Sequence, residues 1–446
     1  MKWKSSIETG SKYAPDIVRE ISLQRRETFA LKTRLQKSWG RLHLSDIGFR
    51  EIAMMRRIRS IGQLFSGVQN MREHAARKKI LRASLGLAGM VAVVGLSGCN
   101  GWNRYYVGGG GDYYGNNALW VANGTNVVEF LPSQLTNGTI DPAPHLAINS
   151  ASFGAPQGVV FDGYGDLWVI DGGTVAAGGT VAPALYEFTV KQLSNLSTNA
   201  APTPAVTISS TSFVFPQQAT FDGRGNLWVT DNGSNAVYVF TGAQLNATAT
   251  TAPAVSITST PAFNGPLGIA FDYHGDLYVA NNATTTIFGF SAASLPAVSS
   301  SSTATVTAAL VPTETLSDNG SGSIQGPWGL AFDGYGNLWS SNANAPNTVV
   351  EFTRSQITAT GSPTPNITLA SATVSGNATL VAPNGIAFDD YGDLAAVSSA
   401  SPFGVAGFGP DQLQTNPSAP LTPDLFLVGS ASTLNAPAGI AFGPSY

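Results

Sequence analysis

Short apolar runs recur along the larger, C-terminal part of the chain, and each is bounded by proline, glycine or a polar turn. One phrase returns almost unchanged, and its first full copy reads Pro-Gln-Gly-Val-Val-Phe-Asp-Gly-Tyr-Gly-Asp-Leu-Trp from Pro156 to Trp168. Further copies begin at Pro216, Pro266, Pro327 and Pro383, and a truncated copy begins at Pro437, with successive prolines 60, 50, 61, 56 and 54 residues apart. Such a period indicates a repeat protein in which each copy is one supersecondary unit.

Each repeat contains four segments with the character of a β-strand. The first is the apolar run after the proline, and it ends in an Asp-x-x-Gly turn whose glycine accepts the left-handed conformation of a tight hairpin. The second has the form of Leu227–Asp231, and the third ends in Phe, as in Val237–Phe240. The fourth follows a proline-rich segment such as Pro202–Ile208, because proline is tolerated where an edge strand begins. We therefore predict one four-stranded antiparallel sheet per repeat.

The order of these segments predicts a closed ring. Four antiparallel strands per repeat of this length are typical of a β-propeller blade. The chain enters the array at a second strand, Leu119, and leaves it after a first strand that contains Phe442. The C-terminal strand should therefore join the N-terminal blade, which removes the free sheet edges of an open stack. We predict an all-β fold, a six-bladed β-propeller over 118–446, in which the Ser- and Thr-rich stretch 291–326 is a long loop.

The repeated phrase Pro-x-Gly-Ile-Ala-Phe-Asp-x-x-Gly-Asn-Leu-Trp-Val-x-Asp resembles that of NHL-repeat propellers. It is also similar to the phrases of gluconolactonase-type and streptogramin-lyase-type propellers. The resemblance covers 118–446 and implies a six-bladed architecture. It implies no single activity, because these relatives include binding modules, metal-dependent lactonases and a lyase.

Charge divides the chain into two parts. Residues 1–98 hold 19 of the 23 Lys and Arg residues, whereas 99–446 hold four basic and twenty acidic side chains. Before Cys99, a basic segment from Met71 is followed by an apolar run too short to span a bilayer and then by small residues, which is the order of an export signal. We predict a signal peptide over 71–98 and a Gly- and Tyr-rich tether over 99–117. The basic segment 1–70 either lies upstream of a true start codon at Met71, which we favour, or forms an unusually long n-region of the signal.

Cys99 is the sole cysteine, and Leu96-Ser97-Gly98-Cys99 resembles the lipobox of bacterial lipoproteins. The resemblance implies a lipidated Cys99 that anchors the protein to the bacterial cell envelope, and Asn100 favours the outer membrane over the inner one. Each buried methylene of an acyl chain contributes about 0.8 kcal/mol, so two or three chains anchor a protein firmly. The alternative is a free, buried cysteine after an ordinary signal peptide.

The acidic part of the chain restricts the partners. A domain with four basic and twenty acidic side chains is repelled by phosphate, which argues against nucleic acid as a ligand. We expect a monomer whose faces bind protein, peptide or carbohydrate.

Most acidic residues recur at one position of several blades, which indicates a structural role. The recurring sets are the turn aspartates (Asp162, Asp222, Asp272, Asp333, Asp389), the residues before the second strand (Asp166, Asp276, Asp393), those that end it (Asp171, Asp231) and those in the third strand (Glu129, Glu187, Glu351). A lactonase-type Ca²⁺ site needs several converging oxygens. The resemblance to gluconolactonase-type propellers implies that the Asn of a Pro-Asn-Gly phrase is a metal ligand, and Pro383-Asn384-Gly385 matches this phrase. The matching glutamate and aspartate cannot be found by position, so we predict no cofactor and leave Ca²⁺ open as the one candidate metal.

The residue between Pro and Gly should vary with function, because it lies where the innermost strand begins, at one mouth of the channel. These six positions read Gln157, Gln217, Leu267, Trp328, Asn384 and Ala438. We predict that Gln157, Gln217, Trp328 and Asn384 bind a neutral polar ligand.

Residues with catalytic potential are few. A lyase of the streptogramin type needs a histidine beside an acid, but we expect His145 and His274 to be exposed. The second strands contain four tryptophans that we expect to belong to the core and not to a binding platform: Trp120, Trp168, Trp228 and Trp339. We therefore favour a binding module and assign no catalytic residue. The alternative is a metal-dependent lactonase or hydrolase, or a lyase, of the gluconolactonase or streptogramin-lyase kind.

Overall fold

The structure is a computed structural model that describes residues 117–176, 179–299, 305–429 and 434–446. The predicted segments 1–70 and 71–98 lie outside the described residues, as does the predicted 99–117 tether up to residue 116, including Cys99. Asn117, the last residue of the predicted tether, instead begins a strand. Within the described ranges, no helix has the length and apolar character needed to cross a membrane.

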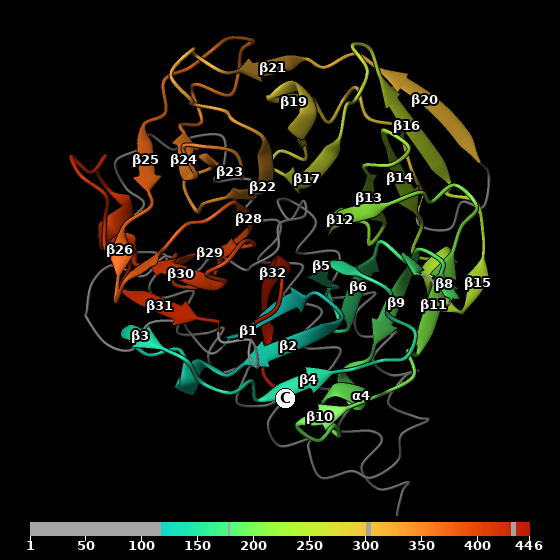
Figure 1. The fold of residues 1–446 in the computed structure, drawn as a ribbon. Coiled ribbons are helices and arrows are strands. Elements are labelled where there is room, and N and C mark those ends of the chain that lie inside the picture. The colour runs from blue at the N-terminus through green and yellow to red at the C-terminus, as the bar shows by residue number, and fades with distance from the viewer. Residues whose placement is uncertain (1–116, 177–178, 300–304, 430–433) are drawn as a thin grey trace, which may run out of the picture. The chain divides into compact units, whose positions relative to one another are not determined.

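Six β-sheets are arranged around a central axis, and they form the predicted six-bladed β-propeller (Figure 1). The first strand of each blade begins at the proline of the repeated phrase and lies nearest the axis. In blade order these strands are β32 (Pro437–Pro444), β5 (Pro156–Phe161), β12 (Pro216–Phe221), β17 (Pro266–Phe271), β22 (Pro327–Phe332) and β28 (Pro383–Phe388).

The second strands pair antiparallel with the first, and the Asp-x-x-Gly turns join them in blades 2 to 6 as predicted. The glycines that close these turns have φ between 78° and 88°. The second strands are β1 (Asn117–Asn123), β6 (Leu167–Asp171), β13 (Leu227–Asp231), β18 (Leu277–Asn281), β23 (Leu338–Asn342) and β29 (Leu394–Ser398).

The third and fourth strands complete each blade outward from the axis. The third strands are β2 (Asn126–Phe130), β9 (Ala184–Phe188), β14 (Ala236–Phe240), β19 (Thr286–Phe290), β24 (Thr348–Phe352) and β30 (Gly404–Phe408). The fourth strands are β4 (Leu146–Ile148), β11 (Val206–Ser209), β16 (Val255–Ser259), β21 (Glu314–Ser317), β25 (Ile367–Ala370) and β31 (Leu425–Val428). Short helical turns follow several third strands: η1 (Pro132–Gln134), α4 (Val190–Leu193), η2 (Gln244–Asn246) and η4 (Pro410–Leu413).

Four blades have a fifth strand, which corrects the prediction of four strands per blade. Each added strand comes from the next blade along the ring and pairs in parallel with a fourth strand, at the periphery of Figure 1. The pairs are β10 (Asn199–Ala200) with β4, β15 (Ala249–Thr250) with β11, β20 (Val306–Leu310) with β16, and β3 (Gly138–Ile140) with β31. The stretch 291–326 is therefore no plain loop, because it supplies both β20 and β21.

The C-terminal strand closes the ring as predicted. β32 pairs antiparallel with β1 in a register that places Leu119 opposite Phe442 and Val121 opposite Ile440. Blade 1 thus takes its innermost strand from the C-terminal end of the chain, and the two strands lie side by side in Figure 1.

Aromatic residues pack one blade against the next. In five blades the aromatic residue of the second strand contacts the phenylalanine that ends the first strand of the following blade, with ring centroids 5.3–6.4 Å apart. Trp120, Trp168, Trp228 and Trp339 are at most 2% exposed, so their predicted place in the core is confirmed. Such edge-to-face pairs add to the hydrophobic gain from burial.

Smaller elements complete the fold. Two short hairpins extend from blades 2 and 5, β7 (Thr174–Ala176) with β8 (Gly179–Val181) and β26 (Thr373–Val374) with β27 (Asn377–Ala378). A single turn, η3 (Asn282–Thr284), joins β18 to β19.

Candidate functional site

The four residues predicted to bind a ligand lie at the start of the innermost strands, but they differ in exposure. Gln217 is 3% exposed and Trp328 is 7% exposed, whereas Gln157 and Asn384 are half-buried. Trp328 packs with Leu267 and Ala438, the residues at the same position in two other blades, and the three form a small apolar cluster. The Trp328 side chain is therefore largely buried in this cluster.

The axis behind this mouth is closely packed. In five blades the next residue is glycine, and a Cβ at Gly158 or Gly385 would lie 2.7 Å from the carbonyl oxygen of the neighbouring blade. Gln218 takes this position in blade 3, and its amide nitrogen donates to the carbonyl of Gln157 at 2.6 Å. The remaining axial cavity has a volume of about 30 Å³ and is lined by Gln218, Trp328 and residues of the innermost strands.

The last residue of each second strand holds the segment that leads into the first strand. The carboxylate of Asp171 accepts hydrogen bonds from the N–H groups of Gly154, Ala155 and Gly173, and Asp231 accepts three in the same way. Asparagine or serine takes this role in the other blades, and all six residues are at most 6% exposed: Asn123, Asp171, Asp231, Asn281, Asn342 and Ser398. The structural role expected for this position is confirmed by these contacts.

The turn aspartates also have a structural role. In each turn one carboxylate oxygen accepts N–H bonds from the residues two and four positions later, at 2.8–3.0 Å. In blades 3 and 5 the other oxygen accepts an asparagine side chain and a tryptophan N–H. These turns lie at the opposite end of the blades from Gln157 and Asn384.

Asn384, whose Pro-Asn-Gly phrase left Ca²⁺ open, lies at a mouth where the described residues form no cluster of three potential metal ligands. The backbone carbonyl of Asn384 accepts a hydrogen bond from the Ser341 hydroxyl at 2.5 Å. Among the residues that the structure describes, one group of three potential ligands is close enough to hold a metal: Asp162, Asp166 and Glu187. This group lies at the turn end of blade 2, so the structure does not bring Asn384 together with it.

His145 and His274, the two histidines within the described residues, are exposed, in agreement with the sequence prediction. His274 has a partner that the sequence did not indicate, because Nη2 of Arg354 lies 2.8 Å from its Nε2. The Arg354 guanidinium also lies over the Tyr273 ring, 4.7 Å from its centroid. These three side chains link the turn of blade 4 to blade 5.

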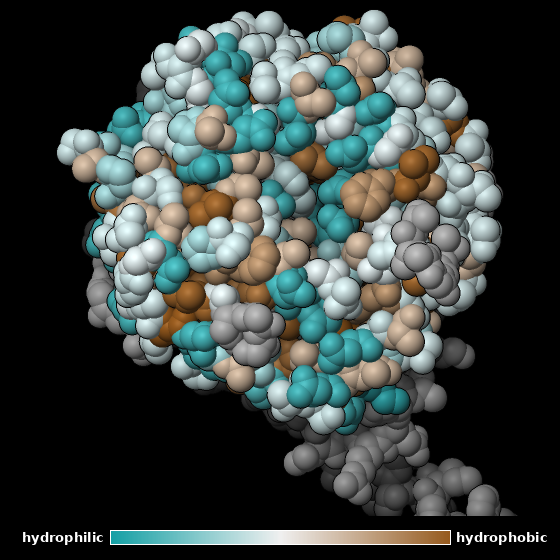
Figure 2. All heavy atoms as spheres, in the orientation of Figure 1, coloured by the Kyte–Doolittle hydropathy of each residue, from teal (hydrophilic) through white to brown (hydrophobic). Residues whose placement is uncertain are grey.

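The turns present tyrosine side chains to solvent, which sequence reasoning missed. We name the turn end of the propeller the hairpin face. Its exposed tyrosines occupy the variable positions of four Asp-x-x-Gly turns: Tyr164 (85% exposed), Tyr273 (43%), Tyr335 (75%) and Tyr391 (49%). The recurrence of tyrosine in four of the five turns was the sequence signal that could have revealed these exposed side chains. Figure 2 shows one face of the ring, where apolar residues occur singly or in small groups among polar ones.

Comparison with known proteins supports the fold alone. No family model matches the sequence, and no curated protein matches it. Among solved structures, a protein of unknown function from Bacteroides caccae has a TM-score of 0.50 at 8% identity, covering 74% of this chain and all of the other. Streptogramin B lyase has a TM-score of 0.36 at 15% identity over 59% of this chain and 68% of the other. A putative 6-phosphogluconolactonase from Bacteroides fragilis has a TM-score of 0.45 at 13% identity over 73% and 97%.

Proposed function

We propose that this propeller is a binding module of the bacterial cell envelope, anchored through a lipidated Cys99, that recognises a protein, peptide or carbohydrate on its outer surface. The observation that carries the proposal is the packed axis. A cavity of about 30 Å³ holds no more than a water molecule or two, whereas ligand sites for small molecules usually measure several hundred Å³. A lactonase or lyase acting in the channel would need a substrate-sized cavity there.

The hairpin face offers the better binding surface. Tyr164 and Tyr335 are 85% and 75% exposed, and tyrosine supplies a large, rigid contact area with a polar tip. At the opposite mouth Gln157 and Asn384 are half-buried, and Trp328 is packed into an apolar cluster. The excess of acidic side chains favours a neutral or cationic ligand.

The test compares the two faces on carbohydrate and peptide arrays. The purified protein should bind members of one class, and Tyr164→Ala/Tyr335→Ala should weaken that binding at least tenfold, because aromatic anchors contribute most of the energy of many interfaces. The matched variant Gln157→Ala/Asn384→Ala should bind like the wild type. Loss of binding in this second variant alone would move the ligand to the predicted mouth, and lactone hydrolysis abolished by Asn384→Ala would favour an enzyme instead.

A further inference from the structure

In blades 3 and 5 the turn aspartate on the hairpin face accepts hydrogen bonds from two side chains. In blade 5 the Asn337 side chain and the Trp339 N–H donate to Oδ2 of Asp333, at 2.9 and 3.1 Å. In blade 3 Asn226 and Trp228 donate to Asp222 in the same way, at 2.8 and 3.1 Å. Each of these carboxylates thus receives two side-chain donors.

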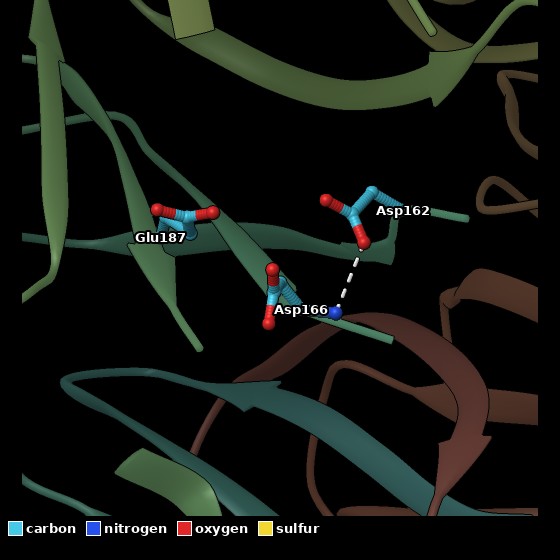
Figure 3. Close-up of side chains that lie close together, drawn as sticks. All are labelled: Asp162, Asp166 and Glu187. Atoms are coloured by element: carbon cyan, nitrogen blue, oxygen red, sulfur yellow. Dashed lines mark hydrogen bonds between the residues drawn. The ribbon is translucent and has the colours of Figure 1, made fainter. Parts of the chain in front are cut away.

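Blade 2 carries the same arrangement with its asparagine replaced by an acid. Asp166 stands where Asn226 and Asn337 stand, and Glu187 on β9 lies opposite Trp168 across the ladder. Figure 3 shows the three carboxylates of Asp162, Asp166 and Glu187 gathered together, with one oxygen of each within 4.8 Å of the others. The hydrogen bond drawn there comes from the Asp166 backbone N–H, so it brings no positive side chain to the group.

A buried donor at this cluster also lacks a protein partner. Trp168 is 2% exposed, and its indole N–H makes no hydrogen bond, unlike those of Trp228 and Trp339. Trp168 occupies the same position as Trp228 and Trp339, whose N–H groups donate to their turn aspartates, so its N–H faces Asp162 of the cluster. A water molecule in the coordination shell of a cation would accept this hydrogen bond.

The charges of the cluster repel one another. Burial raises the pKa of Glu187 to about 7, and the carboxylates of Asp166 and Asp162 contribute to the rise. Asp166 accepts one backbone N–H, from Val190 at 2.7 Å. The nearby hydroxyl of Tyr446 donates to the Gly165 carbonyl at 2.5 Å. A divalent cation held between the three carboxylates would offset their mutual repulsion.

From this geometry we propose that Asp162, Asp166 and Glu187 bind one Ca²⁺ ion on the hairpin face of blade 2. Two oxygens on opposite sides of Ca²⁺ lie roughly 4.8 Å apart, because each Ca–O distance is about 2.4 Å, and backbone carbonyls and water complete the shell. The ion would tie the turn that carries Tyr164 to β9. This site is separate from the channel mouth and does not rest on the proposed binding function.

The test is calorimetric titration of Ca²⁺ into the purified protein after dialysis against EDTA. We expect one site per chain, with binding weakened at least tenfold by Asp166→Asn and by Glu187→Gln. Asn at position 166 should fold, because Asn occupies the equivalent positions 226 and 337. Thermal melts should show a Ca²⁺-dependent rise of several degrees in the wild type and none in Asp166→Asn.

Asp276→Asn is the matched control. Asp276 occupies the same position in blade 4 and accepts the Ala292 N–H at 2.7 Å, as Asp166 accepts that of Val190, but it belongs to no group of three close ligands among the described residues. This variant should bind Ca²⁺ like the wild type. The proposal is wrong if the wild type binds no Ca²⁺ at millimolar concentration, or if Asp166→Asn binds as tightly as the wild type.

Discussion

A glutamine after the third strand shows how one residue connects two features of the repeat. In five blades its amide nitrogen donates to a carbonyl that immediately precedes a proline, at 2.6–2.9 Å. In four of these blades its oxygen also accepts the N–H of the residue three positions earlier. In each of these five blades one glutamine side chain therefore links the turn after the third strand to the proline-rich segment before the fourth. The five glutamines are Gln134, Gln192, Gln244, Gln356 and Gln412.

Glu129 makes stability depend on pH at the level of one residue. Its side chain is 0% exposed, and burial raises its pKa from 4.5 to about 7. The unfolded chain loses this proton first, so the free energy of unfolding should fall as pH rises from about 4.5 to 7, by about 3 kcal/mol in total for this group. Glu129→Gln should flatten this dependence and stabilise the protein above pH 7.

Urea unfolding at pH 5, 6, 7 and 8 measures this effect, with Asp411→Asn as the control at an exposed carboxylate. Glu187 titrates in the same range and remains in the variant, so only the difference between wild type and Glu129→Gln reports on Glu129. Equal slopes in the two proteins would refute the assignment.

At the residue scale, the sequence predicted the positions of the candidate site residues but not which of their side chains lie close together. The repeat placed Trp328 at the mouth of the channel, but its packing onto Leu267 and Ala438 depends on the radius of the ring, which the repeat does not encode. Asp162, Asp166 and Glu187 each recur in other blades, so position by position they indicate scaffolding. The signal lies in their combination, since blade 2 alone has acids at all three positions.

At the scale of elements, the strands with a strong local pattern were predictable. Prolines, Asp-x-x-Gly turns and terminal phenylalanines mark the first three strands of each blade. The added strands lack such a pattern, because β10 and β15 are only two residues long and pair with a neighbouring blade. β20 has the sequence Val-Thr-Ala-Ala-Leu, which does not alternate between apolar and polar residues, and its partner β16 is about 50 residues away. These strands cover edges that would otherwise be open to other chains.

The parallel pairing of β20 with β16 can be tested by a proline substitution. The N–H of Val306 donates to the Ala254 carbonyl at 2.8 Å, and Val306→Pro removes this donor at the start of the strand. We expect a loss of about 1–2 kcal/mol in the free energy of unfolding. Hydrogen exchange over 306–310 should accelerate, while the inner strands of blade 3 should be unaffected.

Val311→Pro is the control for this change, because Val311 is 67% exposed and follows the end of β20. Equal protection of 306–310 in wild type and Val306→Pro would show that this pairing contributes nothing to the order of the segment.

At the scale of the whole molecule, stability depends on closure. In an open array of repeats each unit contacts only its neighbours, so the loss of a terminal strand has a limited effect. Here β32 lies between β1 of its own blade and β28 and β5 of the two adjacent blades. The space for a Cβ at Gly443 is filled by the ring of Phe161, and a Cβ at Gly439 would meet the Gln157 carbonyl at 2.6 Å. One strand thus completes blade 1 and contacts both neighbouring blades.

Deletion of 437–446 should therefore affect the entire ring. The deletion exposes the inner edge of β1. It also removes the contact between the rings of Trp120 and Tyr446, whose centroids lie 6.1 Å apart. We expect the truncated protein to lose its single cooperative melt and to aggregate, because a long apolar edge strand pairs readily with other chains. A synthetic peptide of residues 434–446, added in excess, should restore a cooperative melt, whereas a scrambled peptide should not. A truncated protein that melts like the wild type would mean that the blades are stable without closure, as in an open repeat array.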